Sequence, residues 1–262
     1  MIDKIEKSLV KVRSQKPLIL CLTNFVTMEF VANSLLALGA APIMSICDEE
    51  IEELVKVAAA LYVNIGTLDY NFIGLAKKAI DIAKQYKKSI VFDPVGSGAT
   101  TIRTDISKSI LSSAKFIRGN SSEIMSLSNN NYTTYGVEAN IRTDEVEEIA
   151  KRLSLDNHSI VVVSGSVDFI TNGEKSIKVP FGSPLMQRVT GMGCSLTAVI
   201  SAFCSAVEDY FESAVIAVHY FALCGEIASK KQNSLGAFKI AFLDQLHSPD
   251  FTLMRDVYDQ RR

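Results

Sequence analysis

The sequence lacks any stretch rich in proline, glycine or serine that could link two domains, and only six of its 262 residues are proline. A chain of this length is long enough for one large α/β domain or for two small ones. Because the composition does not shift along the chain either, we expect residues 1–262 to form a single domain.

The sequence also lacks the cysteine patterns of metal sites. Its five cysteines form no Cys-x-x-Cys pair and no cluster with the three histidines, which argues against a zinc site. The number of cysteines is odd, and the first residues, Met-Ile-Asp-Lys-Ile-Glu-Lys, do not resemble an export signal. Since free thiols are typical of a reducing compartment, we expect a cytoplasmic protein.

Neither sign of charge dominates the chain. The formal net charge is -2, and the basic residues are interspersed with acidic ones, so we expect no nucleic-acid partner. One segment, residues 213–225, is almost wholly apolar, but Glu212 and Glu226 bound it, and it is shorter than the roughly 20 residues needed to cross a bilayer. We expect this segment to be a buried helix, and we expect no membrane partner.

What the sequence does contain is an alternation of strand and helix patterns. Continuous apolar runs, typical of strands covered on both faces, are followed by polar turns and then by apolar residues at helical spacing. The predicted strands are 18–22, 42–44, 60–65, 89–92, 114–117 and 159–163, and the helices among them include 104–113 and 144–154. This order predicts an α/β fold with a mostly parallel central sheet and helices on both faces.

Local features add detail to this prediction. Asn172 and Gly173 form a turn pair between residues 169–171 and 175–178, which predicts an antiparallel hairpin at one edge of the sheet. Asp48 is a candidate N-cap for the helix that follows it. The polar residues 129–135 predict a surface loop, and the pattern after residue 190 is almost wholly helical.

The segment 188–197, Arg-Val-Thr-Gly-Met-Gly-Cys-Ser-Leu-Thr, is the main candidate for a functional loop. Gly191 and Gly193 precede apolar residues spaced as on one face of a helix, so the loop opens a helix. The first turn of a helix offers unpaired backbone N–H groups and a partial positive charge, and glycines allow another group to approach them. The loop is therefore a candidate phosphate site.

Cys194 lies at the mouth of that predicted helix. The positive end of a helix stabilises a thiolate, which predicts a lowered thiol pKa for Cys194. The alternative is that Cys194 is a small core residue, as free cysteines commonly are. The loop by itself does not separate these two interpretations.

Further polar residues follow the predicted strands. In parallel α/β sheets ligands bind at the carboxyl ends of the strands, so side chains from different strands should converge there. The residues in such positions are Asn24, Gly66, Asp93, Arg118, Asn120, Glu123 and Ser164.

The motifs around these residues run in one order over nearly the whole chain. They are Thr23-Asn24-Phe25-Val26, Asn64-Ile65-Gly66-Thr67-Leu68, Asp93-Pro94-Val95-Gly96, Arg118-Gly119-Asn120-Ser121-Ser122-Glu123 and the loop up to Cys194. In these motifs the sequence resembles the hydroxyethylthiazole kinases of thiamine salvage, within the ribokinase-like superfamily. The resemblance implies a ribokinase-like three-layer sandwich. Cys194 is itself a marker, because most relatives in the superfamily have a catalytic aspartate there.

The resemblance also implies an activity, the ATP-dependent phosphorylation of 4-methyl-5-(2-hydroxyethyl)thiazole. The backbone N–H groups of Gly191 and Gly193 would hold the transferred phosphoryl group, while Cys194 accepts or directs the proton of the substrate hydroxyl. It further implies a homotrimer with sites between neighbouring subunits. The residues that it assigns to the thiazole alcohol are Asn24, Met44, Gly66 and Gly191, and those that it assigns to ATP are Arg118, Asn120 and Ser164.

Two carboxylates are the candidate magnesium ligands. Mg²⁺ prefers oxygen ligands and keeps several waters, and the resemblance assigns this role to Asp93 and Glu123. The alternatives are a helix cap for Asp93, a solvated first-turn acid for Glu123 and a core residue for Met44. The three histidines match no catalytic position and are expected in loops or in the core: His158, His219 and His247.

The sequence departs from the family pattern at two places. The segment Ser234-Leu235-Gly236-Ala237-Phe238 keeps only the middle glycine and the phenylalanine of the family's Gly-Pro-Gly-Ser/Thr-Phe turn, and Met192 replaces a small residue. Alternatives therefore stay open: a related kinase of hydroxymethylpyrimidine or pyridoxal, an ATP-dependent dehydratase of the same fold, and a catalytically silent nucleotide-binding protein.

Overall fold

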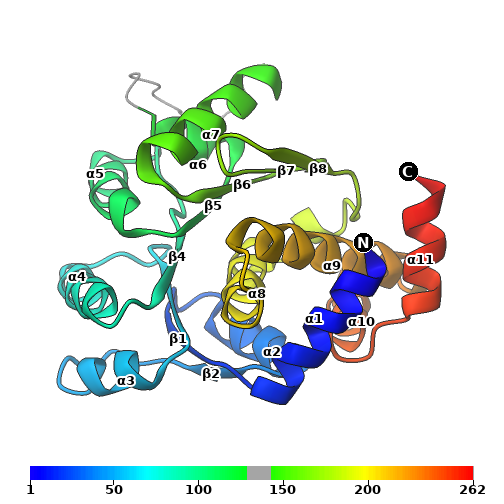
Figure 1. The fold of residues 1–262 in the computed structure, drawn as a ribbon, viewed down its shortest axis with the longest axis horizontal. Coiled ribbons are helices and arrows are strands. Elements are labelled where there is room, and N and C mark those ends of the chain that lie inside the picture. Colours follow the sequence, from blue (N-terminus) through cyan, green and yellow to red (C-terminus); the bar gives the residue numbers. More distant parts are fainter. Residues whose placement is uncertain (129–142, 262) are drawn as a thin grey trace.

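The computed structural model describes residues 1–128 and 143–261, and the loop predicted at 129–135 lies outside them. One eight-stranded sheet, in the order β2-β1-β3-β4-β5-β6-β7-β8, runs through the molecule with helices on both faces (Figure 1). The first six strands in this order are parallel, and β7 and β8 are antiparallel. The predicted α/β architecture with an antiparallel edge is confirmed.

The strands follow the apolar runs of the sequence. Their bounds are β1 Leu18–Leu22, β2 Ala41–Ile43, β3 Ala60–Asn64, β4 Ser89–Asp93, β5 Phe116–Asn120, β6 Ile160–Ser164, β7 Asp168–Thr171 and β8 Ser176–Val179. The central strands are buried almost throughout, because helices cover both of their faces. The turn of the hairpin consists of Asn172 and Gly173. Asn172 Oδ1 accepts hydrogen bonds from the N–H groups of Glu174 and Lys175, and the φ of Gly173 is 91°.

One face of the sheet carries the larger core. Its helices, shown mostly to the right of the sheet in Figure 1, are α1 Ile2–Gln15, α2 Met28–Leu38, α8 Met192–Ala206, α9 Tyr210–Lys231, α10 Leu235–His247 and α11 Phe251–Gln260. Helix α8 packs across β1, β3 and β4 and against α9. Each large apolar side chain buried there, such as Phe203, stabilises the fold by about 1.5–3 kcal/mol.

The opposite face carries the smaller core. Its helices are α3 Ile51–Val57, α4 Tyr70–Gln85, α5 Thr101–Ile110, α6 Ser121–Ser126 and α7 Thr143–Asn157. They cover β3 to β6 with apolar residues that include Ile80 and Ile124. The two cores lie on either side of the sheet, which gives the three layers seen in Figure 1.

Several predicted boundaries were wrong. The helix predicted at 104–113 is α5, which begins three residues earlier and ends at Ile110, before a short 3-10 helix, Leu111–Ser113. The strand predicted at 114–117 is β5, at Phe116–Asn120. Arg118 and Asn120 therefore lie in the strand, where they pair with Val162 and Ser164 of β6. Asp48 is not an N-cap either: α3 begins after Glu50, and the carboxylate of Asp48 pairs with Lys78 on α4.

Helix α9 is longer than the apolar segment that predicted it. With 22 residues it is long and apolar enough to cross a membrane by length and composition, but 89% of its most apolar window is buried inside the protein. It lies between α8 and α10 and also contacts the hairpin strands. The prediction of a buried helix at 213–225 is confirmed.

Candidate active site

The sheet brings the polar strand ends together. Strand order reverses at β1, since β2 lies on one side of it and β3 on the other, and such a reversal is where parallel sheets bind ligands. Asn64 at the end of β3 pairs in register with Asp93 at the end of β4. Asn24 follows β1 closely and is buried as well. Residues predicted separately thus share one edge.

Helix α8 begins at that edge as predicted. Its N-cap is Gly191, whose φ of 93° lies in the left-handed region that favours glycine. Gly193 is needed for a different reason: a β-carbon there would lie 2.3 Å from the Nη1 atom of Arg118. The guanidinium of Arg118 therefore packs directly on the first turn of α8. This contact joins two predicted site elements that are far apart in sequence.

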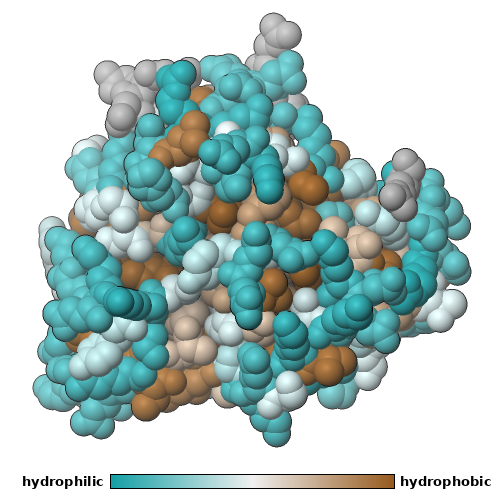
Figure 2. Space-filling model, in the orientation of Figure 1, coloured by the Kyte–Doolittle hydropathy of each residue, from teal (hydrophilic) through white to brown (hydrophobic). Residues whose placement is uncertain are grey.

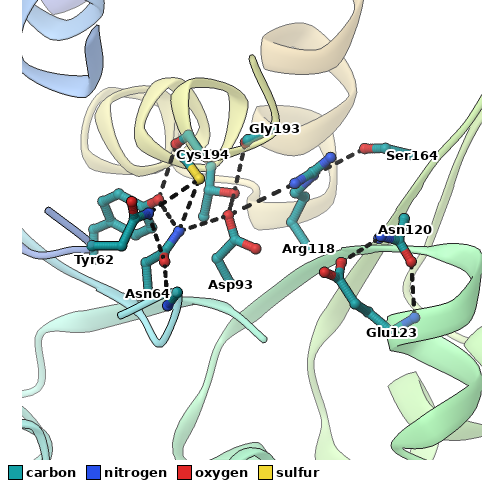
Figure 3. A network of polar contacts seen from close by, with 12 residues as sticks. Tyr62, Asn64, Asp93, Arg118, Asn120, Glu123, Ser164, Gly193 and Cys194 are labelled. Carbon is teal, nitrogen blue, oxygen red and sulfur yellow. Dashed lines mark hydrogen bonds and ion pairs between the residues drawn. The ribbon is translucent and has the colours of Figure 1, made fainter. Parts of the chain in front are cut away.

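Arg118 is the central cation of the site (Figure 3). Its Nε donates to Ser164 Oγ at 2.9 Å, and its Nη1 lies 3.7 Å from Asp93 Oδ2. Burial lowers the pKa of the guanidinium, but the carboxylates of Asp93 and Glu123 outweigh it and raise the pKa above its usual value. Arg118 thus stays charged inside the protein, as an anion-binding residue must.

Asn64 is a site residue that the sequence reasoning missed. Its Nδ2 lies 3.2 Å from both Cys194 Sγ and Asp93 Oδ2, and its Oδ1 accepts Asn24 Nδ2 at 3.0 Å and the Gly66 N–H at 2.9 Å. It connects Asn24, Gly66, Asp93 and Cys194, and Figure 3 shows its contacts with Asp93 and Cys194. The sequence did contain an indication of this role, because Asn64 is a polar residue at the end of an otherwise apolar strand and begins the motif Asn64-Ile65-Gly66-Thr67-Leu68.

The predicted low pKa of Cys194 is wrong. Burial first, and then the charge of Asp93, raise the thiol pKa above its usual value. The sulfur is within hydrogen-bond distance of the side-chain amides of Asn24 at 3.4 Å and Asn64 at 3.2 Å. Helix α8 does begin close by, but burial and a nearby carboxylate act against a thiolate more strongly than the helix end favours it. At neutral pH Cys194 is therefore a neutral thiol.

Asp93 is fully buried at the end of β4. Its Oδ2 accepts Thr197 Oγ1, a second missed residue, at 2.8 Å, while its Oδ1 is buried without a hydrogen-bond partner among the described residues. Burial raises its pKa to about 6 against the pull of Arg118. An unpaired carboxylate oxygen, with the carboxylate of Glu123 close enough to help raise the pKa of Asp93, is a donor set that fits Mg²⁺. The alternative of a helix cap is wrong for Asp93.

Glu123 and Asn120 form a capping box at the start of α6. Glu123 Oε2 accepts the Asn120 N–H at 2.8 Å, and Glu123 Oε1 accepts the Gly96 N–H at 3.0 Å. Glu123 is buried, so the alternative of a solvated acid is wrong. Because two backbone groups fix its carboxylate, Glu123 also positions the loop after β4, which contains Gly96.

A cavity of about 960 Å³ opens beside this network. It is lined by Gly191 and Gly193, by the buried Met192 and by all three residues predicted to bind ATP: Arg118, Asn120 and Ser164. Its size suits a nucleotide. The remaining predicted residues form the network behind Arg118 and Gly193 and do not line the cavity: Asn24, Gly66, Asp93, Glu123 and Cys194.

Other predicted residues lie as follows. A β-carbon on Gly66 would meet Asn24 at 2.9 Å, so the fold itself already requires a glycine there. Met44 follows β2, is half-buried and packs against the larger core, outside the network. Ser234 is the N-cap of α10, and Gly236 lies in its first turn with open space around it. Two histidines are exposed and His219 is buried, with His219 Nδ1 2.8 Å from Val215 O.

The chain is similar in sequence to known proteins. The model of the hydroxyethylthiazole kinase family matches residues 9–250. The hydroxyethylthiazole kinase of Chlamydia caviae is 46% identical over 99% of this chain and 100% of its own length. That of Desulfotalea psychrophila is 41% identical over 92% of this chain and 89% of its own.

Solved structures agree with these matches. A hydroxyethylthiazole kinase protein from Pyrococcus horikoshii superposes with a TM-score of 0.88 at 35% identity, covering 97% of this chain and 96% of its own. The pyridoxal kinase of Bacillus subtilis, at 14% identity and a TM-score of 0.61 over 79% and 91% of the two chains, shares the fold alone. The predicted ribokinase-like sandwich is confirmed, and by family model and identity the chain belongs to the hydroxyethylthiazole kinase family.

Proposed function

We propose that this protein transfers the γ-phosphoryl group of ATP to the primary hydroxyl of 4-methyl-5-(2-hydroxyethyl)thiazole, in thiamine salvage. The observation that carries the proposal is Cys194 at the start of α8, held by two asparagines directly behind the cavity that Arg118 and Gly193 line. This arrangement supports transfer between a nucleotide in the cavity and an alcohol beside the thiol.

The chain's own residues would act mainly by positioning. Phosphoryl transfer passes through a loose transition state, so placement and charge neutralisation do most of the catalysis. Arg118, kept charged by its carboxylate neighbours, would bind the phosphates from the cavity wall. The backbone N–H groups of Gly191 and Gly193 would stabilise the charge on the transferred group.

Cys194 would direct the attacking hydroxyl as a neutral thiol. Its sulfur is fixed by Asn24 and Asn64, so its position is set before substrate binds. In a loose transition state the hydroxyl proton leaves late, so a neutral thiol that orients the hydroxyl is sufficient, and the proton passes to an oxygen of the transferred phosphoryl group as the new O–P bond forms. Asn24, Gly66, Gly191 and, more remotely, Met44 remain the proposed contacts of the thiazole alcohol.

Asp93 and Glu123 would hold Mg²⁺, which supplies neutralisation of the phosphate charge when it is bound. The unpaired Oδ1 of Asp93 supports this proposal. Since Arg118 lies beside the same carboxylates, the cation and the arginine would together keep Asp93 ionised at neutral pH.

We further infer a single domain of residues 1–262 that acts as a cytoplasmic homotrimer, without nucleic-acid or membrane partners. Support for self-association comes from exposed apolar residues that follow β1 and edge strand β2, namely Phe25, Val26 and Ile46. Figure 2 shows apolar surface along the lower edge, where Figure 1 places β2 and α3. A monomeric mass by light scattering would contradict the trimer.

The decisive experiment is ADP release from ATP and Mg²⁺, measured with the thiazole alcohol, with a hydroxymethylpyrimidine, with pyridoxal and with no acceptor. We expect turnover that depends on the thiazole alcohol. Turnover with another alcohol would favour a related kinase, and turnover only with a hydrated nicotinamide nucleotide would favour a dehydratase. ATP binding without turnover on any of them would indicate a catalytically silent protein.

A further inference from the structure

Helix α11 lies outside the range that the family model matches, which ends at residue 250. Arg261, at the C-cap of α11, nevertheless lines the cavity that also contains Arg118 and Gly193. In Figure 1 the chain that leaves β8 runs toward the side of the molecule that carries α9 and α11. An element outside the family core therefore contributes to the candidate nucleotide site.

Arg261 makes three contacts, two with the chain after β8 and one with Glu226 on α9. Its Nη1 donates to the Pro180 carbonyl, its Nη2 lies 3.2 Å from Glu226 Oε1, and its guanidinium carbon lies 5.9 Å from the centre of the Phe181 ring. Tyr258, one helical turn earlier, stacks on Phe181 with ring centres 5.5 Å apart and planes 27° apart. Two residues at one end of α11, Tyr258 and Arg261, thus contact the Phe181 ring.

Glu226 strengthens this anchor from α9. Its side chain is only 6% exposed, so a charge there needs partners. Its Oε2 accepts the Gly182 N–H at 3.3 Å, and Lys230 is 3.7 Å from its Oε1, somewhat farther than Arg261. Removing Arg261 would leave Glu226 with one distant cation and would loosen the residues next to Phe181.

The cavity lining divides into two chemically different parts. Near the strand ends it is polar and carries Arg118 and the start of α8, whereas near α9 it is lined by Phe181, Met186 and Phe221. Phosphates suit the first part and a flat, weakly polar base suits the second, because aromatic faces bind such rings.

We propose that Arg261 is a positioning residue for the nucleotide base: it holds Phe181 in place as the wall on which the base packs. This inference rests on the proposed function, since it assumes that ATP occupies the cavity. It predicts an effect on nucleotide affinity that is separate from the phosphoryl-transfer step, because the contacts of Arg261 are with Pro180, Phe181 and Glu226 and not with Cys194, Asn24 or Asn64.

The test is Arg261→Ala, compared with Arg255→Ala as a matched control. Arg255 is also on α11 and half-exposed, but it pairs with Asp3 and Glu6 on α1, away from the cavity. For Arg261→Ala we expect the KM for ATP to rise about tenfold while kcat changes less than about twofold. The KM for the thiazole alcohol should stay unchanged, and Arg261→Lys should recover part of the ATP affinity.

A double-mutant cycle with Phe181→Leu tests whether Arg261 acts through the ring. If it does, the two substitutions are non-additive, because each removes the same wall. Direct titration with ATP separates the proposed kinase function from the proposed role of Arg261. Failure of the wild-type protein to bind ATP would overturn both, whereas unchanged ATP affinity in Arg261→Ala, or additive effects in the cycle, would overturn only the role of Arg261.

Discussion

At the scale of single residues, environment decides what Cys194 can do. The start of a helix stabilises a thiolate, yet burial and the neighbouring Asp93 raise the pKa of the Cys194 thiol. The balance depends on Asp93 and Asn64, which are distant in sequence and adjacent only in the fold. Chemistry at this position therefore depends on orientation more than on a preformed base.

We expect Cys194→Ala to lower kcat by about tenfold to a hundredfold with a smaller change in KM, because the proposed role of the thiol is to orient the attacking hydroxyl in the chemical step. Cys194→Asp should keep activity, since Asn24 and Asn64 can donate to a carboxylate. Steady-state kinetics check both variants. Cys204→Ala is the matched control, a buried cysteine on the same helix. Unchanged kcat in Cys194→Ala would mean that Cys194 is only a packing residue.

At the scale of elements, α5 connects the loops that carry the site. Arg103 on α5 donates to the carbonyls of Ile65 at 2.7 Å, Val95 at 2.8 Å and Gly66 at 3.0 Å. These carbonyls lie directly after β3 and β4, next to Asn64 and Asp93. One guanidinium thus sets the distance between two strand ends.

Arg103→Ala should destabilise the protein by about 2–4 kcal/mol, because three carbonyls lose a charged donor. It should also raise the KM for the thiazole alcohol, since Gly66 moves with its loop. Chemical denaturation and kinetics measure the two effects. Arg103→Lys should be intermediate, because an ammonium reaches fewer carbonyls at once. The control is Lys108→Ala, which removes an exposed cation from the same helix. An equal loss of stability in that variant would contradict the role of Arg103 in joining the loops after β3 and β4.

At the scale of the whole molecule, buried acids couple folding to pH. Burial raises the pKa of Asp168 from 3.8 to about 6, while its Oδ1 accepts the Gly165 N–H at 3.0 Å. At a pH between 3.8 and about 6, Asp168 keeps its proton in the folded chain and loses it in the unfolded chain. Raising the pH through this window therefore favours unfolding.

Asp168→Asn should remove this dependence, because the amide oxygen keeps the bond from Gly165 and does not ionise. We expect the stability of the variant relative to the wild type to increase by up to about 3 kcal/mol as the pH rises from 4 to 6, and to stay level above 6. Urea denaturation of both proteins across this range measures it. A difference that does not vary with pH would mean that Asp168 ionises normally in the folded protein.

Much of the fold followed from local sequence. The apolar runs of β1, β3, β4 and β6 predicted buried parallel strands, and Asn172 and Gly173 predicted the hairpin, because strand burial and turn geometry depend on neighbouring residues. The motifs at the strand ends and the loop up to Cys194 were likewise sufficient to identify the family. The end of β5 was missed because its pairing with β6 extends through the polar Arg118 and Asn120.

The sequence by itself determined the order of strands and helices, the residues at the strand ends and the glycines that open α8. Only the tertiary structure decided the charge state of Cys194, the linking role of Asn64 and the presence of Arg261 at the cavity. The physical reason is that periodicity and turn preference act over a few residues. A pKa or a cavity wall is set by burial and charge from groups that only folding brings together.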